Sequence, residues 1–91
     1  MKKVFFLMNR AGDSVFGVIS ANHGQLPAFF TDEATASAFL ASKIEDYDQH
    51  TFGSTDDPDA VRHFLNFNEK SYVLLDGAPM TGVEMFEALK D

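Results

Sequence analysis

Acidic side chains in the middle of the chain are the first candidates for chemistry, because hard cations such as Ca²⁺ bind carboxylate oxygens. The candidate ligands are Asp46, Asp48, His50, Asp56, Asp57 and Asp59. Counted from Asp46, however, Thr51 and Asp57 occupy the sixth and twelfth positions, where a calcium loop requires glycine and a bidentate glutamate. His63 follows Asp59 by one helical turn, but no third ligand has a spacing suited to zinc. The sequence therefore predicts no metal centre and no cofactor, and these acids are expected to cap helices and solvate a loop.

The sequence contains no recognisable arrangement of residues for nucleophilic or acid-base catalysis. Ser14 and Ser20 lie in or near predicted turns and lack the glycine-flanked elbow that presents the serine of hydrolases. The chain has three histidines and no cysteine. An acid-base pair would need two partly buried carboxylates with separated pKa values, and one small core leaves little volume for a substrate cleft of about 300 Å³. We therefore expect no enzyme, and a small enzyme that uses carboxylates or histidine is the catalytic alternative.

Binding of nucleotides or nucleic acids is disfavoured by composition and motif. Residues 77–82 (GAPMTG) form neither a Walker loop nor a GxGxxG fingerprint and contain no lysine to hold a phosphate. The formal net charge is −7, and among the seven basic residues only Lys2 and Lys3 are adjacent. Proteins that bind nucleic acids concentrate lysine and arginine on one face. Direct contact with DNA or RNA is therefore not expected.

The negative charge is concentrated in residues 32–59, which hold eight of the fourteen acidic residues against the single base Lys43. This window accounts for the whole formal charge of −7. Clustered charge steers association with an oppositely charged surface, and aromatic side chains such as Tyr47 and Phe52 can anchor it. We interpret the chain as a non-catalytic protein-binding or regulatory module whose partner has a basic surface. The predicted binding residues, here named the acidic face, are Glu45, Asp46, Tyr47, Asp48, Asp56, Asp57 and Asp59.

Other interpretations of the acidic face stay open. The protein could be a DNA mimic or phage-type inhibitor that occupies a nucleic-acid-binding site. B-DNA carries a charge about every 1.7 Å of its axis, whereas residues 34–44 of the predicted helix contain no acid. The acids could also serve only to keep a phenylalanine-rich domain in solution. The sequence is compatible with a homodimer as well.

Length and composition predict a single domain, residues 1–91, with one core. With 45% hydrophobic residues and ten phenylalanines, the chain is far from the composition of disordered proteins. The apolar run 4–8 is shorter than the roughly 7 to 15 residues of a signal peptide's hydrophobic region. No segment has the roughly 20 apolar residues of a membrane span. We therefore expect a cytoplasmic protein.

The strands that must position these residues can be read from apolar runs and turn signals. Residues 4–8 are apolar without alternation, which predicts a central strand covered on both faces. Residues 15–19 are expected to pair with them as a hairpin, with Gly17 at a bulge or close approach. Residues 26–30 predict a third strand, placed at an edge because Pro27 cannot donate to a ladder. Residues 71–75 predict a fourth strand, which ends at Asp76 and Gly77.

The helices are indicated by capping residues and apolar spacing. Thr31 is the expected N-cap of a helix that runs to about residue 46, and residues 48–57 are expected to form a polar loop. Asp57 as cap and Pro58 at the first position predict a short second helix. Thr81 and Glu84 fit a capping box that begins a last helix at residues 81–90. The buried stripes of the three helices are predicted to be Ala36, Phe39, Leu40, Ile44 and Tyr47, then Val61, Phe64 and Leu65, then Met85, Phe86 and Leu89.

The order β-β-β-α-α-β-α predicts a two-layer α+β fold with a mixed four-stranded sheet and helices packed mainly on one face. Residues 26–33 (LPAFFTDE) with the following helix, and residues 72–77 leading into 80–83 (MTGV), resemble the N-terminal domain of the SseB (enhanced serine sensitivity) family. The resemblance covers residues 26–89. It implies a small bacterial domain of this fold without an assigned catalytic apparatus, and it supplies no site residues.

Overall fold

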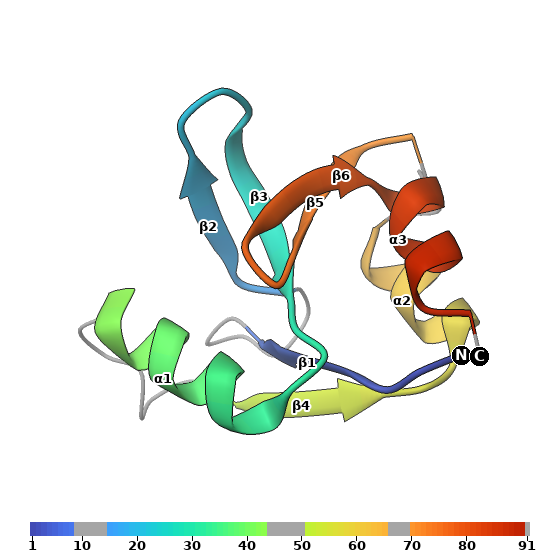
Figure 1. Cartoon of the computed structure of the whole chain (residues 1–91), viewed down its shortest axis with the longest axis horizontal. Coiled ribbons are helices and arrows are strands. Elements are labelled where there is room, and N and C mark those ends of the chain that lie inside the picture. The colour runs from blue at the N-terminus through green and yellow to red at the C-terminus, as the bar shows by residue number, and fades with distance from the viewer. Residues whose placement is uncertain (9–14, 44–50, 66–69, 91) are drawn as a thin grey trace.

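The computed structural model describes residues 1–8, 15–43, 51–65 and 70–90. In these ranges the elements follow in the order β1 (Val4–Leu7), β2 (Gly17–Ser20), β3 (Gly24–Phe29), α1 (Glu33–Lys43), β4 (Phe52–Thr55), α2 (Pro58–Phe64), β5 (Tyr72–Leu75), β6 (Ala78–Thr81) and α3 (Gly82–Ala88) (Figure 1). The radius of gyration is 12.0 Å. The predicted α+β class is confirmed.

A mixed four-stranded sheet forms the centre of the fold, as predicted, with the strand order β2-β3-β5-β6. β3 and β5 are parallel, with Ala28 opposite Leu74 and Phe29 opposite Leu75. The other two pairs are antiparallel. The chain between β3 and β5 contains α1, β4 and α2, so the predicted helical crossover is present and also contains a strand.

The first strand lies outside this sheet, contrary to the prediction. β1 pairs with β4 in a separate antiparallel ladder, where Phe6 lies opposite Gly53. A bridge between Phe5 and Phe30 links β1 to the residue that follows β3. β4 occupies part of the predicted loop 48–57. Its sequence, FGST, has one large apolar side chain, and its pairing depends on a strand far away in the chain rather than on its own composition.

The first hairpin joins β2 to β3 rather than β1 to β2. Between the expected partners the structure has a single bridge, from Met8 to Val15. The predicted close approach at Gly17 is present, because the Gln25 side chain lies across it. The edge position predicted from Pro27 is wrong, since β3 is internal. Its parallel ladder with β5 begins at Ala28, the next residue, so the missing N–H of Pro27 interrupts no described pair on that side.

The second hairpin adds a strand that the sequence reading omitted. Asp76 and Gly77 have positive φ values of 52° and 84° and connect β5 directly to β6. A two-residue turn with positive φ at both positions has the twist that hairpins favour. The Asp76 carboxylate also accepts hydrogen bonds from the backbone N–H of Thr31, at 2.9 Å, and from its hydroxyl, at 2.7 Å. The turn is therefore fixed to the segment between β3 and α1.

The helix caps match the sequence except at α1. Asp32 rather than Thr31 caps this helix, because its carboxylate accepts from the Thr35 backbone N–H at 2.8 Å and from the Thr35 hydroxyl at 2.7 Å. The remainder of the predicted helix, residues 44–46, lies outside the described ranges. Asp57 caps α2 with Pro58 at its start, as predicted. α3 has the predicted capping box and ends at Ala88, two residues earlier than expected.

Two apolar clusters lie on the two sides of the strands. One contains residues of α2 and α3, and the other contains residues of α1. β1 contributes Phe6 to the first cluster and Leu7 to the second, so it is covered on both faces as predicted. β3 does the same, with Phe29 in the first cluster and Leu26 and Ala28 in the second. Two of the three described helices thus share a face, and Figure 1 shows α1 at the opposite end of the molecule from α2 and α3.

Candidate partner-binding surface

The described part of the acidic face lies where β4 ends and α2 begins. Asp56, Asp57 and Asp59 occupy this junction, and all three are exposed. The chain turns here because Asp57 is extended, with φ −96° and ψ 113°, before Pro58 opens the helix. The remaining predicted residues, Glu45, Asp46, Tyr47 and Asp48, lie outside the described residues. The structure therefore brings three of the predicted acids together.

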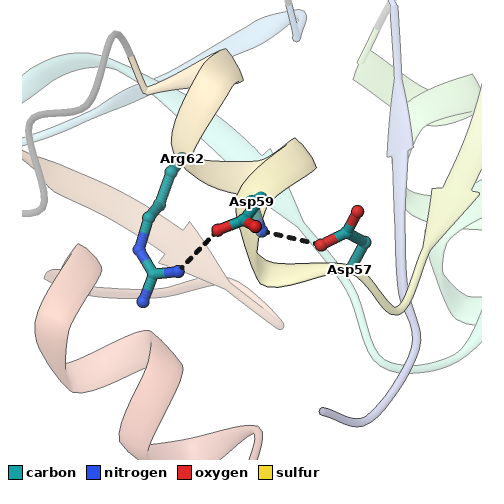
Figure 2. Close-up of polar contacts among 3 residues, drawn as sticks. All are labelled: Asp57, Asp59 and Arg62. Atoms are coloured by element: carbon teal, nitrogen blue, oxygen red, sulfur yellow. Dashed lines mark hydrogen bonds and ion pairs between the residues drawn. The ribbon is translucent and has the colours of Figure 1, made fainter.

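Asp57 caps helix α2 in addition to contributing negative charge. Its Oδ1 atom accepts a hydrogen bond from the Asp59 backbone N–H at 2.9 Å (Figure 2). Its own N–H donates to the Thr55 hydroxyl at 3.1 Å. A helix begins with N–H groups that have no partner within the helix, and a capping carboxylate satisfies one of them. Replacing Asp57 would therefore alter the helix start as well as the surface charge.

Asp59 has a cationic neighbour one helical turn away. Arg62 donates to its Oδ1 atom at 3.1 Å (Figure 2), with 87% of the Asp59 side chain and 36% of the Arg62 side chain exposed. The Arg62 guanidinium also lies over the Phe86 ring, 4.8 Å from its centroid. An exposed pair of this kind contributes about 0 to 1 kcal/mol to stability. Its effect on the surface is to offset one of the negative charges.

Asp56 differs from its two neighbours. In the ranges that the structure describes, no group donates a hydrogen bond to it or pairs with it, and its side chain is exposed. Its charge is therefore available to a ligand without loss of a cap or an ion pair. Of the three described acids, Asp56 is the one whose substitution tests surface charge alone.

Of the two aromatic residues proposed as anchors, only Phe52 lies among the described residues. Phe52 belongs to β4, is half-buried, and stacks on Phe5 with a centroid distance of 6.2 Å and an interplanar angle of 21°. It packs against the cluster that contains α1 residues, so it supports the fold rather than projecting into solvent. Tyr47 lies outside the described residues. The strand β4, which sequence reasoning missed, explains the different role of Phe52.

The next question is whether the described residues could bind a metal ion. No group of three His, Asp or Glu side chains there could hold an ion together. The proposed pair of Asp59 and His63 is further weakened because Asp59 is bonded to Arg62. Asp46, Asp48 and His50 lie outside the described ranges.

One carboxylate of the described chain has a shifted pKa, and it belongs to a helix cap. The hydroxyl and then the backbone N–H of Thr35 donate to Asp32 and hold its pKa below the ordinary value for aspartate. Hydrogen bonds to the ionised form stabilise that form. A base or nucleophile would require a partner with a complementary role, and Asp32 has none beyond its cap.

Two open grooves exceed the volume expected for so short a chain. The first, of about 430 Å³, is lined by residues of β3, β5 and the end of α2, including His23, Ser71 and Tyr72. The His23 and Tyr72 rings lie 4.4 Å apart at their centroids, with an interplanar angle of 30°. No hydrogen bond joins the described residues His23 and Ser71, so the groove shows no activated serine. The second groove, of about 410 Å³, lies beside β2.

Comparison with protein-family models, with curated proteins and with solved structures yields no match. The resemblance to the SseB family therefore stays a prediction. None of the helices in the described ranges has the length and apolar character needed to cross a bilayer.

Proposed function

We propose that the protein acts without chemistry of its own, by binding a protein with a basic surface through the acidic face. The observation that carries this proposal is the segregation of charge: residues 32–59 account for the whole formal charge of −7. A charge that served only to keep the protein in solution would have no need to gather in one part of the sequence. Charge gathered on one side raises the rate of encounter with an oppositely charged partner.

The described contacts support a binding role for the start of α2. Asp56, Asp57 and Asp59 are close in sequence, exposed, and lie at the junction of β4 and α2, where the Asp57 carboxylate caps the helix. A backbone already fixed by the helix cap needs little ordering when a partner binds, and this lowers the entropic cost of association. Arg62 offsets part of the charge of Asp59, so Asp56 and Asp57 are the strongest described contributors.

The DNA-mimic alternative has less support from the described helix. α1 contains one acid, Glu33, at its start and ends with Lys43. A mimic of the phosphate backbone would need regularly spaced acids along such an element.

The proposal is tested with baits that differ only in charge. Immobilised wild-type protein and the Asp46→Lys/Asp48→Lys/Asp56→Lys variant are exposed to a lysate at low salt, and retained proteins are identified by mass spectrometry. Asp57 is kept because it caps α2. We expect a basic protein that the wild type retains and the variant does not. Equal retention of every captured protein by both baits would contradict the proposal.

A further inference from the structure

The outer edge of β2 is a surface that the described residues leave unpaired. The strand order places β2 at one end of the four-stranded sheet and β6 at the other. β2 pairs with β3 along Gly17–Ser20, and no described residue pairs with its other side (Figure 1). The backbone groups of such an edge can bind another strand.

The sequence of β2 lacks two of the features that protect a sheet edge, a charged side chain and a proline. Its residues, GVIS, include no charge and no proline, whereas β6 contains Pro79. Ile19 is 81% exposed, the highest value among the exposed large hydrophobic side chains of the described residues. The open groove beside the strand is lined by Phe16, Val18, Ile19 and other residues, with Lys43 of α1 at its border. An uncharged edge with an exposed isoleucine is suited to pairing rather than to permanent solvation.

We propose that β2 pairs antiparallel with β2 of a second copy of this chain, around a two-fold axis at Ile19. A second copy fits because the strand is uncharged, so two copies can meet without like charges between the paired residues. The described acids at the start of α2 lie toward the other end of the molecule, as Figure 1 shows. Centring the axis on Ile19 places each exposed side chain against its own counterpart and joins the two sheets into one.

The dimer is weak and responds to salt in a characteristic way. A four-residue strand pair buries less than the roughly 1,200 Å² of a standard interface, so association is expected near millimolar concentration. Each copy carries a formal charge of −7, so salt strengthens the dimer by screening repulsion. Binding of a basic partner to the acidic face weakens with salt. The two proposals can therefore fail independently.

The first test is sedimentation equilibrium from 10 µM to 1 mM at low and high salt. The wild-type mass is expected to rise from 10.1 kDa toward twice that value, more strongly at high salt. The Ile19→Lys variant should stay monomeric over the same range. The control Val83→Lys changes another exposed apolar residue, 47% exposed on α3, and should behave as the wild type. A wild type that remains monomeric at 1 mM, or an Ile19→Lys variant that dimerises equally, overturns the proposal.

The second test does not depend on disrupting the strand. The chain has no cysteine, so a single introduced thiol can be crosslinked without background. Opposite residues of antiparallel strands have Cα atoms about 4.5 to 5.5 Å apart, within the range that a disulfide spans. Mild oxidation should convert Ile19→Cys to a covalent dimer at least tenfold faster than Val83→Cys. Equal rates for the two variants would show that the copies do not meet at β2.

Discussion

At position 53 only glycine fits without displacing Phe6, the residue opposite it in the ladder of β1 and β4. A Cβ atom placed there would lie 2.9 Å from Cε2 of the Phe6 ring, and Phe6 is buried in the core with 4% exposure. The ring covers the glycine, an arrangement that compensates for the missing side chain in the strand.

We therefore expect Gly53→Ala to destabilise the fold by about 1 to 3 kcal/mol through overpacking. The matched control is Ser54→Ala at the exposed neighbouring position, which should change the free energy of unfolding by less than about 0.5 kcal/mol. Urea denaturation measures the free energy of unfolding of both variants and of the wild type. Equal stability of the Gly53→Ala variant and the wild type would show that Phe6 moves aside without loss of packing.

Asp32 provides a prediction about pH at the same scale. Its pKa is lowered in the folded protein by the Thr35 hydrogen bonds, so the ionised cap stabilises α1. This contribution is complete above the pKa that Asp32 has in the unfolded chain, and it is lost as the pH falls through the lower, folded pKa. Asp32→Ala should thus be less stable than wild type at pH 7, and the difference should shrink in strongly acidic solution. A difference independent of pH from neutral to strongly acidic solution would mean that charge has no part in the cap.

At the scale of elements, α3 is the helix whose start is best determined by local sequence. The Glu84 backbone N–H donates to the Thr81 hydroxyl oxygen at 3.2 Å, and the Thr81 backbone N–H donates to Glu84 Oε1 at 3.1 Å. Met85 and Leu89 are fully buried below this cap. The capping box thus joins a local signal to the core.

Replacing Thr81 by Ala should reduce the free energy of unfolding by about 1 kcal/mol, because the backbone N–H of Glu84, in the first turn of α3, loses its acceptor. The melting temperature should fall by about 4 to 8 °C for a domain of this size. Glu84→Gln is the control, since glutamine also completes a capping box. A Thr81→Ala variant that melts with the wild type would contradict the role of this cap.

The helix starts could be predicted from the sequence because their signals are local, whereas the strand pairing could not. Asp57 with Pro58, and Thr81 with Glu84, lie within a few residues of the N–H groups that they serve. β4 and the separation of β1 from the main sheet depend on contacts between distant segments. β6 could have been found, because Asp76-Gly77 is a strong hairpin signal. The Pro79 that follows is compatible with a strand at the edge of a sheet, which is where β6 lies.

The same distinction applies to the candidate surface. The capping role of Asp57 was predicted from its neighbours, and the pairing of Asp59 with Arg62 follows from their three-residue spacing on a helix. The packing of Phe52 against Phe5 required knowledge of β4. The charged residues could thus be found from the sequence. Which of them already make contacts within the fold could not.

For the whole molecule, we expect no tight and specific site for a divalent cation. Calorimetric titration with Ca²⁺, Mg²⁺ and Zn²⁺ at physiological salt should give only weak heats that fall as salt increases, because exposed carboxylates attract cations without a complete ligand set. Asp48→Ala serves as the paired variant. A one-to-one micromolar isotherm that this substitution abolishes would require a metal site in the acidic face.

The central claim, that the acidic face steers a basic partner, is tested most directly by the rate of association. Stopped-flow mixing with the basic protein captured by the wild type measures this rate from about 10 to 150 mM salt, over which the Debye length falls from about 30 to 8 Å. Three proteins are compared: wild type, Asp56→Lys and the control Glu87→Lys, which makes the same change of charge on α3. We predict an association rate that falls with salt for the wild type, falls at least severalfold at low salt for Asp56→Lys, and changes little for Glu87→Lys. Equal rates for Asp56→Lys and Glu87→Lys, or a wild-type rate independent of salt, would contradict the claim.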